Sequence, residues 1–378
     1  MIKATCGWKI EQGALPGSIS PKNKYSYRLE SSNQNMNSQE NYYKVAINGY
    51  GRIGQSVLRA IYSSPFRSKF KIVAINELAD IETLTYLTRY DTTHGRFPYP
   101  LHFENEYLYV GDDKIRVINQ ADPARLPWRE LDIDLLFECS GTFDDRKTAE
   151  KHLHSGARRI LLSHPATPDV DATIVYGYNH SLLRAEHQVV SNASCTTNCV
   201  VPVLNLLDRE LGIENGVSTT IHSAMNDQPV IDRYHHTDLR LTRSALHSII
   251  PVDTGLAKGI DRLMPHLAHR FECLHVRVPT INVSVMDLSI NVKTATTAGQ
   301  VNQMMHKEAQ GPLHGLLGYT EEPHASVDFN TDPRSSIVDG TQTRVCGGKL
   351  VKMLCWFDNE WGFANRMLDV ANRWLDLR

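Results

Sequence analysis

The chain has 378 residues, of which 41% are hydrophobic and 22% charged, with a formal net charge of -2. This length favours two domains over one, and the lack of surplus positive charge argues against nucleic acid as a partner. No stretch reaches the roughly 20 apolar residues that span a bilayer, and the N-terminus lacks the apolar core of a signal peptide, so we expect a cytoplasmic protein with no membrane partner. Seven cysteines in so long a chain favour reduced thiols over a disulfide framework.

Residues 1–43 are rich in Ser, Asn, Lys and Gly and show no apolar periodicity. This composition predicts a flexible N-terminal extension. Translation could instead start at Met36, or the segment could be a pro-segment or a docking arm that packs through Trp8, Tyr25 and Tyr27. We assign no function to the extension.

Apolar strands alternate with helical segments after the extension. The pattern predicts strands over 44–48 and 71–77 with a helix over 55–62 between them, followed by further buried strands over 134–140 and 159–163. Repeated strand, helix and strand units are typical of a doubly wound parallel α/β sheet. We therefore expect a dinucleotide-binding Rossmann domain over 44–194.

The second half has longer strands, predicted over 216–223 and 277–293. Within 277–293 one set of alternate residues is mostly apolar, which favours a sheet covered by helices on one face. We expect an α+β catalytic domain over 195–358, with a large and mostly antiparallel sheet. The last segment, 359–378, has the apolar spacing of an amphipathic helix, and we expect it to pack back on the first domain.

A glycine motif directly follows the first predicted strand. Gly49, Gly51 and Gly54 stand where a dinucleotide fold needs a tight turn, close backbone approach to a pyrophosphate, and close packing of helix on strand. Glu77 ends the next strand, roughly 20 residues further on, where a carboxylate binds a ribose diol and repels a 2′-phosphate. The combination predicts NAD as the cofactor.

The segment Ser191–Cys199 reads SNASCTTNC and predicts a helix start. Ser194 is a candidate N-cap, which would place Cys195 in the first helical turn. A helix N-terminus and a nearby imidazolium would favour the thiolate, so we expect a nucleophile at neutral pH. Cys199 lies one turn further on, where structural packing is the simpler role. The surrounding sequence lacks the further ligands of a metal site, so no metal is expected.

His222 ends the predicted strand 216–223, and the ends of strands are where α/β proteins place working side chains. Because the chain has 17 histidines, most of them must be bystanders. His222 is a candidate general base only in combination with Cys195.

Six ordered motifs resemble the glyceraldehyde-3-phosphate dehydrogenase superfamily, and the resemblance covers nearly everything after residue 43. They are NGYGRIG, SNASCTTNC, TTIHSAMNDQ, SIIPVDTG, VRVPTINVS and WFDNEWGFANRM. Within the superfamily, the runs VAINELAD, YDTTHGRF, HSAMNDQ and FNTDPRSSIVDGTQTRV are most similar to the erythrose-4-phosphate dehydrogenases.

The resemblance implies a mechanism. Cys195 would attack the aldehyde, His222 would be the base, and oxidation would leave a thioester on the cysteine. In the erythrose 4-phosphate branch, water cleaves this thioester to give 4-phosphoerythronate on the route to pyridoxal 5′-phosphate. In the glyceraldehyde 3-phosphate branch, inorganic phosphate cleaves it.

The resemblance also implies binding roles and an assembly. Substrate would be bound by Ser194, Thr196, Thr254, Gly255 and Arg277, the last of which could instead be an exposed structural arginine. Cofactor contacts would come from the main chain at Arg52 and Ile53 and from Asn359, which could also serve as a helix cap. The implied assembly is a homotetramer in which the loop 224–246 reaches toward a neighbour's cofactor site.

Two departures from the pattern bear on substrate. The third residue after the catalytic histidine is a phosphate-binding threonine in the glyceraldehyde enzymes, but here it is Met225, which offers no hydrogen bond. Both branches usually carry two adjacent arginines in this segment, and the second of them is Leu241 here. Either Arg240 or Arg243 takes over its role, or the phosphate site is weaker. Of the two arginines we favour Arg240. Both departures favour hydrolysis of the thioester.

The alternative enzyme is a phosphorylating glyceraldehyde-3-phosphate dehydrogenase, since it shares the catalytic pair. A non-catalytic binding protein that retains the fold is the alternative of another class. The joint presence of Cys195, His222, Glu77 and Asn359 argues against it.

Overall fold

The computed structural model describes residues 42–235 and 238–377. Most of the expected extension, residues 1–43, therefore lies outside the described residues. Tyr43 is described and already belongs to the first strand, one residue earlier than the sequence predicted. Among the helices of the described ranges, none has the length and apolar character needed to cross a membrane.

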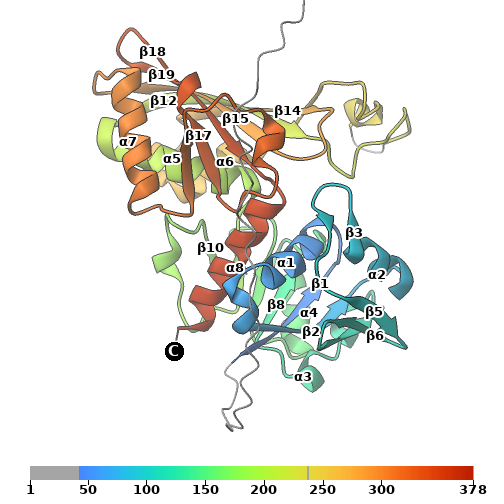
Figure 1. The fold of residues 1–378 in the computed structure, drawn as a ribbon. Helices are drawn as coiled ribbons and strands as arrows, with labels where there is room; N and C mark the ends of the chain where they lie inside the picture. The colour runs from blue at the N-terminus through green and yellow to red at the C-terminus, as the bar shows by residue number, and fades with distance from the viewer. Residues whose placement is uncertain (1–41, 236–237, 378) are drawn as a thin grey trace, which may run out of the picture. The chain divides into compact units, whose positions relative to one another are not determined.

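The first sheet has nine strands within the described ranges (Figure 1). Its order is β10-β11-β9-β8-β1-β2-β7-β6-β5, parallel from β10 to β7 and antiparallel at the β7-β6-β5 edge. The strands are β1 (Tyr43–Asn48), β2 (Phe70–Asn76), β5 (Leu101–Glu104), β6 (Tyr107–Val110), β7 (Asp113–Ile118), β8 (Leu135–Glu138), β9 (Ile160–Leu162), β10 (Ala172–Thr173) and β11 (Val189–Ser191). The predicted doubly wound sheet is confirmed.

The four strands and the helix that the apolar pattern predicted form within a few residues of their predicted bounds, while β5, β6, β7, β10 and β11 were not predicted. Helix α1 (Arg52–Tyr62) buries Val57, Leu58 and Ile61 against the sheet. The predicted strand 134–140 is shorter in the structure, where β8 begins at Leu135 and ends at Glu138. The carboxyl ends of β1, β2, β7 and β8 lie side by side, which is where open α/β sheets bind ligands.

The second sheet has eight strands in the part of the chain that the structure describes. Its order is β13-β14-β12-β15-β19-β17-β16, with β18 beside β19, and only the pairs β12-β14 and β16-β17 are parallel. The strands are β12 (Ile213–Ser223), β13 (Ile250–Val252), β14 (Phe271–Val278), β15 (Ser284–Val292), β16 (Leu317–Thr320), β17 (Ser336–Asp339), β18 (Arg344–Cys346) and β19 (Leu350–Phe357). The expected mostly antiparallel sheet is confirmed.

The prediction of one strand over 277–293 was wrong. The chain leaves β14 after Val278 and enters β15 at Ser284, with Pro279 in the connection and Val283 at a φ of 63°. Proline has no N–H to donate to a sheet, and a positive φ breaks the extended path. Within β15 the predicted alternation holds, since Met286, Leu288 and Ile290 are fully buried.

Helix α8 (Trp361–Leu375) packs beside α1 of the first sheet (Figure 1). Its apolar face belongs to the same core as β1 and α1, and Trp374 in it is completely buried. The other helices are α2 (Ile81–Arg89), α3 (Trp128–Leu131), α4 (Arg146–His154), α5 (Cys195–Leu211), α6 (Leu256–Leu263) and α7 (Ala298–Gln310). A small hairpin, β3 (Tyr90–Asp91) and β4 (Gly95–Arg96), and seven short 3-10 turns complete the described elements.

Candidate active site

The three glycines of the predicted dinucleotide turn differ in what surrounds them. Gly49 has a φ of 83°, and a Cβ there would stand 2.5 Å from the backbone of Ser140. A Cβ on Gly54 would collide with the carbonyl oxygen of Gly49. Gly51, the N-cap of α1, has open space around the position that a Cβ would take. The turn therefore needs glycine for packing at two positions and leaves a free approach to the helix N-terminus at the third.

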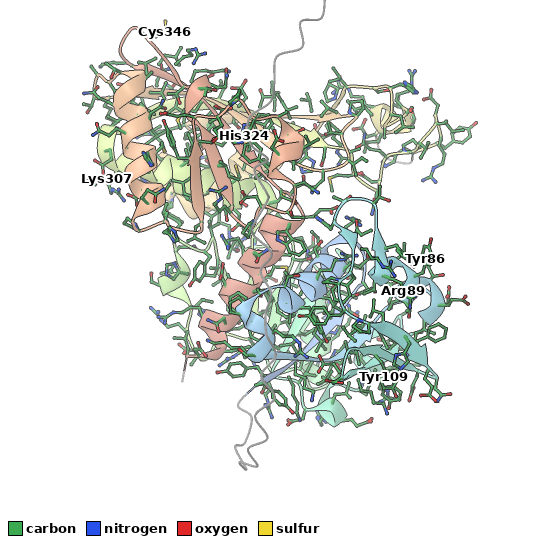
Figure 2. The ribbon with its side chains drawn as sticks, in the orientation of Figure 1. Tyr86, Arg89, Tyr109, Lys307, His324 and Cys346 are labelled. Carbon is green, nitrogen blue, oxygen red and sulfur yellow. The ribbon has the colours of Figure 1, made fainter. Side chains whose placement is uncertain are left out.

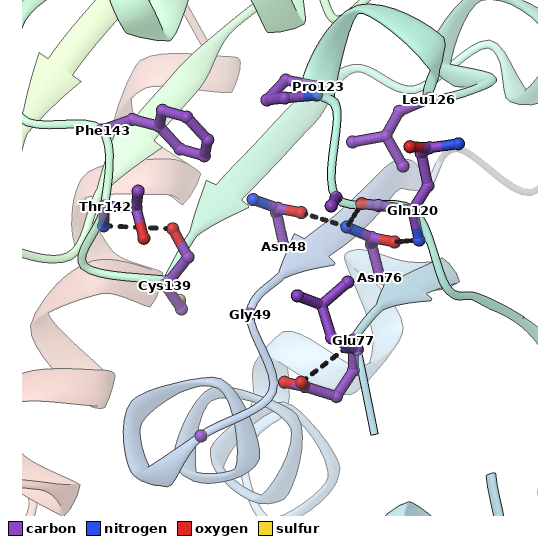
Figure 3. A pocket seen from close by; sticks show the side chains of 14 residues that line it. Asn48, Gly49, Asn76, Glu77, Gln120, Pro123, Leu126, Cys139, Thr142 and Phe143 are labelled. Atoms are coloured by element: carbon purple, nitrogen blue, oxygen red, sulfur yellow. Dashed lines mark hydrogen bonds between the residues drawn. The ribbon is translucent and has the colours of Figure 1, made fainter. Parts of the chain in front are cut away.

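A cavity of about 410 Å³ opens next to this turn (Figure 3). It lies over the carboxyl ends of β1, β2, β7 and β8, and its floor is a chain of buried amides. Asn76 donates to the side chain of Asn48 at 2.7 Å and to the carbonyl of Gln120 at 2.9 Å. Pro123, Leu126 and Phe143 supply apolar walls that a planar base can contact. The cavity suits the adenosine part of a dinucleotide.

Glu77 follows β2 at the rim of this cavity. One carboxylate oxygen accepts a hydrogen bond from the backbone N–H of Tyr50 at 2.7 Å, and the other accepts from Leu78 at 2.7 Å. The oxygen that accepts from Leu78 also accepts a longer bond from the N–H of Ala79 at 3.3 Å, and these contacts fix the negative charge beside the glycine turn. This arrangement fits a ribose diol and is unfavourable for a 2′-phosphate.

The side chain of Arg52 is held by carboxylates. Its guanidinium bonds to Asp91 at 2.7 Å and to Glu360 at 2.8 Å. Burial raises the pKa of both carboxyl groups, but the hydrogen bonds from Arg52, joined at Glu360 by one from His94, outweigh burial and hold both pKa values below the usual range. The backbone N–H groups of Arg52 and Ile53, in the first turn of α1, are among those that a helix leaves without internal partners. The main chain at these residues can therefore bind cofactor phosphate while the arginine side chain ties α1 to the start of α8.

Helix α5 begins at the expected nucleophile. Ser194 is the N-cap, and its hydroxyl accepts from the N–H of Thr197 at 3.0 Å, while the Thr197 hydroxyl accepts from the N–H of Ser194 at 2.8 Å. This reciprocal capping box, with a left-handed Ala193 (φ 58°) before it, places Cys195 at the first position of the helix. Cys199 is fully buried and bonds to Ser336, as the structural interpretation of that residue requires.

The sulfur of Cys195 lies 3.8 Å from Nε2 of His222. The other ring nitrogen, Nδ1, is 2.8 Å from the backbone oxygen of Ser223. Because a carbonyl can only accept, Nδ1 carries the hydrogen, and the neutral ring then presents the lone pair of Nε2 to the thiol. β12 and the start of α5 thus bring the candidate nucleophile and the candidate base together from separate elements.

Burial acts on both members of this pair. It raises the pKa of Cys195 to about 12, although the backbone N–H groups of Thr196 and Cys195 oppose the rise, and it lowers the pKa of His222. Burial therefore favours the thiol and the neutral imidazole over the ion pair. The expected nucleophile at neutral pH stays a prediction, in which the helix N–H groups favour the thiolate and burial opposes it. Transfer of the thiol proton to His222 as the sulfur attacks would activate Cys195.

Asn359 is anchored to two neighbouring strands, β12 and β15. Its side-chain oxygen accepts hydrogen bonds from the hydroxyls of Ser223 at 3.0 Å and Ser284 at 2.9 Å. This network assigns the oxygen and leaves the amide nitrogen as a donor. Asn359 does not cap α8, because Asp358 accepts the first N–H groups of that helix, from Glu360 at 2.9 Å and Trp361 at 2.7 Å.

A second cavity, of about 610 Å³, surrounds the catalytic pair. Several predicted substrate residues line it, namely Ser194, Thr196, Thr254 and Gly255, together with Cys195, His222 and Met225. Gly255 is the N-cap of α6, so backbone N–H groups are available beside the Thr254 hydroxyl. The structure therefore brings these predicted residues around one space.

The predicted arginines do not line this cavity. Arg277 on β14 is the register partner of His222 on β12. It is only 9% exposed and bonds to Asp227 at 2.5 Å. Its burial excludes the alternative of an exposed structural arginine. Arg240 lies on the exposed 3-10 turn Leu239–Thr242, and Arg243 pairs with Asp232 on the surface. Neither Arg240 nor Arg243 is brought to the catalytic pair.

Some lining residues were not predicted. The cofactor cavity is also walled by Gln120 and Phe143, and the ends of the predicted parallel strands were the signal that could have located this region. The catalytic cavity is also lined by Lys258, Arg262 and His275. His275 stands two residues before Arg277, so the alternation of a strand places both on one face.

All six cysteines in the described ranges are free thiols, as predicted. Cys346 is the exposed one and ends β18 (Figure 2).

Two protein-family models match the chain. The model described as glyceraldehyde 3-phosphate dehydrogenase, NAD binding domain, matches residues 43–146. The model described as glyceraldehyde 3-phosphate dehydrogenase, C-terminal domain, matches residues 194–359. Together they cover well over half of the chain, and the second begins at Ser194, the N-cap that precedes the candidate nucleophile.

Proposed function

The chain belongs to the glyceraldehyde 3-phosphate dehydrogenase family and is an NAD-dependent dehydrogenase of a phosphorylated aldehyde; we propose that this aldehyde is D-erythrose 4-phosphate. The proposed product is 4-phosphoerythronate, which would place the enzyme on the route to pyridoxal 5′-phosphate. The observation that carries the proposal is Met225, whose thioether lines the catalytic cavity where a phosphorolytic enzyme needs a hydroxyl.

The chemistry begins at the Cys195–His222 pair. The sulfur forms a bond to the aldehyde carbon as Nε2 of His222 takes the thiol proton. The resulting oxyanion then receives this proton from His222, which gives a neutral thiohemiacetal and a neutral imidazole. Donors in the first turn of α5 face the developing oxyanion. Bound NAD would accept the hydride that this carbon releases, and His222 would then take the hydroxyl proton. The product of this half-reaction is a thioester on Cys195.

The cofactor fits the residues that surround its proposed site. The open space at Gly51 admits a pyrophosphate next to the N-terminus of α1, and Glu77 presents a carboxylate to the ribose. Asn359, with its oxygen held by Ser223 and Ser284, has its amide nitrogen available to orient a nicotinamide carboxamide. Such positioning would set the ring against the carbon attached to Cys195.

We place the substrate phosphate in the same cavity as Cys195. Thr254 and the N-terminus of α6 at Gly255 would donate hydrogen bonds to it, and Ser194 and Thr196 would flank the reacting carbon. Arg277 would add positive charge from behind His222, where Asp227 partly neutralises it. Arg240 is the weakest of the proposed contacts, because it is exposed and does not line the cavity.

The loss of two donors of a second anion site supports hydrolysis, although Lys258 and Arg262 line the same cavity. Arg262 is bound to the carbonyls of Ala166 and Thr167. An inorganic phosphate that attacks the thioester must itself be held as a dianion, which calls for charged or hydroxyl donors. Met225 offers none, and Leu241 stands where the resemblance leads us to expect an arginine. Water needs no such site and would be the attacking group.

The deciding experiment compares initial rates of NADH formation from erythrose 4-phosphate and glyceraldehyde 3-phosphate, each with and without inorganic phosphate. We expect the four-carbon substrate to be preferred and its rate to be independent of phosphate. Dependence on phosphate with preference for the three-carbon sugar would overturn the proposal in favour of the phosphorylating enzyme.

We also propose that the enzyme is a homotetramer. The loop after β12 carries apolar side chains that are largely exposed in the single chain, among them Ile231 at 76% and Tyr234 at 95%. Contact with a neighbouring copy would bury such residues. Light scattering on the purified enzyme should give the mass of four chains, and Ile231→Glu should lower it.

A further inference from the structure

A second histidine shares the catalytic cavity. His275 lies on β14, between Thr220 of β12 and Val252 of β13, and its side chain points to the same face as Arg277. Its ring is stacked on that of His222, with centroids 5.0 Å apart and an angle of 24° between the planes. Both rings line the cavity that contains Cys195.

One nitrogen of this second ring has no partner. Nε2 of His275 is buried and makes no hydrogen bond with any residue that the structure describes. A buried polar atom without a partner costs free energy, so its persistence in a catalytic cavity points to a ligand that meets it during the reaction. The family roles derived above give His275 no task.

The ligand has to suit a neutral imidazole. Burial, together with the nearby His222 and Arg277, lowers the pKa of His275 to about 3. The ring is therefore uncharged at neutral pH and contributes no charge to the binding of a phosphate dianion. An uncharged ring can accept or donate one hydrogen bond at Nε2, which matches a neutral molecule such as water.

We propose that His275 holds the water molecule that hydrolyses the Cys195 thioester. The inference rests on the proposed function, because it concerns the hydrolytic second half-reaction. Nε2 of His275 and Nε2 of His222 both serve one water. His275 fixes its position, and His222 removes one of its protons.

Before hydrolysis, His222 releases to solvent the proton that it took from the thiohemiacetal hydroxyl. The water oxygen then forms a bond to the acyl carbon, and one of its protons passes to Nε2 of His222. The carbon–sulfur bond then breaks, and the sulfur leaves with the electron pair as a thiolate. That thiolate recovers the proton from His222, so the products are the carboxylic acid, which ionises, and the free thiol of Cys195.

The test uses two substitutions that separate the stacking of the His275 ring from the hydrogen bond made by its Nε2. His275→Phe keeps a ring to stack on His222 but removes the hydrogen bond. His275→Gln removes the ring and keeps a polar atom near the position of Nε2. Rapid mixing of each enzyme with NAD and erythrose 4-phosphate resolves the first turnover, which reports acylation, from the steady state, which includes hydrolysis.

We expect His275→Phe to retain the rate of the first turnover, with close to one NADH formed rapidly per site, while its steady-state rate falls about 10- to 100-fold. Mass spectrometry should then find the acyl group on Cys195. His275→Gln should recover most of the lost steady-state rate. The amplitude of the rapid phase also counts the folded sites, so a misfolded variant is recognised at once.

Two results would overturn the inference. Equal slowing of both phases in His275→Phe would mean that the ring only positions His222, and an unchanged steady state would mean that it does nothing in hydrolysis. Failure of the proposed function would be detected in a different measurement. The steady-state rate of the parent enzyme would then require inorganic phosphate.

Discussion

Replacing Gly51 with alanine should separate cofactor binding from folding. Gly51 has a φ of -73°, which alanine adopts without strain, and its Cβ would meet no protein atom within 4 Å. The new methyl group would instead project into the space that we assign to the pyrophosphate. Gly51→Ala should therefore fold normally and bind NAD poorly.

The size of the effect follows from the bonds at risk. A hydrogen bond from a backbone N–H to a charged oxygen contributes about 1.5–3 kcal/mol, so displacement of the phosphate by one methyl group should weaken NAD binding roughly 10- to 100-fold. The stability cost is small. The lower preference for alanine at an N-cap and the reduced entropy of its unfolded chain nearly cancel, which leaves less than about 1 kcal/mol.

Gly54→Ala is the matched control. Its Cβ would collide with the carbonyl oxygen of Gly49, so it should cost about 1–3 kcal/mol of stability through overpacking. Isothermal titration calorimetry with NAD and differential scanning calorimetry give the two quantities for each variant. NAD affinity unchanged in Gly51→Ala, or a melting temperature lowered as much as in Gly54→Ala, would refute this assignment of the glycines.

The remaining predictions concern the catalytic cavity. Cys195→Ser should abolish aldehyde oxidation while NAD still binds; normal turnover would disprove the covalent mechanism. His222→Asn should slow alkylation of Cys195 by iodoacetamide at neutral pH about tenfold or more, since the thiol loses its proton acceptor; an unchanged rate would exclude His222 as the base. Met225→Thr should accelerate phosphate-dependent acyl phosphate formation, measured as added turnover on addition of inorganic phosphate; no gain would remove the main argument for hydrolysis. His275 is protonated below about pH 6.5 in the unfolded chain but only near pH 3 when folded, so the unfolded state binds more protons in this window and stability falls as the pH falls. His275→Gln should lose less stability than the parent between about pH 6.5 and 4.5 in calorimetry, and equal losses would contradict the burial of that ring.

The cofactor half of the molecule could be predicted from the sequence because its signals are local. Gly49, Gly51 and Gly54 follow a strand and open a helix, and the acid Glu77 ends the next strand. Each of these positions can be recognised from a few neighbouring residues, although the packing that requires Gly49 comes from the distant Ser140. The walls of the cavity, such as Phe143, come from distant strands, and only the fold brings them together.

The catalytic half shows where such reasoning fails. Local signals placed Cys195 at a helix start but could not show its desolvation, which depends on residues far along the chain and raises the pKa of the thiol. His275 was one bystander among 17 histidines until β12 and β14 stacked it on His222. The break between β14 and β15, in contrast, has a local signal, because Pro279 argues against one continuous strand.

The packing of α8 has a consequence for biosynthesis. Its apolar face completes the core of the first sheet, and Arg159 and Tyr43 of that sheet bond to the carbonyls of Trp374 and Leu375. A ribosome makes β1 and the glycine turn long before it makes α8. The nascent nucleotide-binding half must therefore keep part of its core uncovered until α8 has emerged.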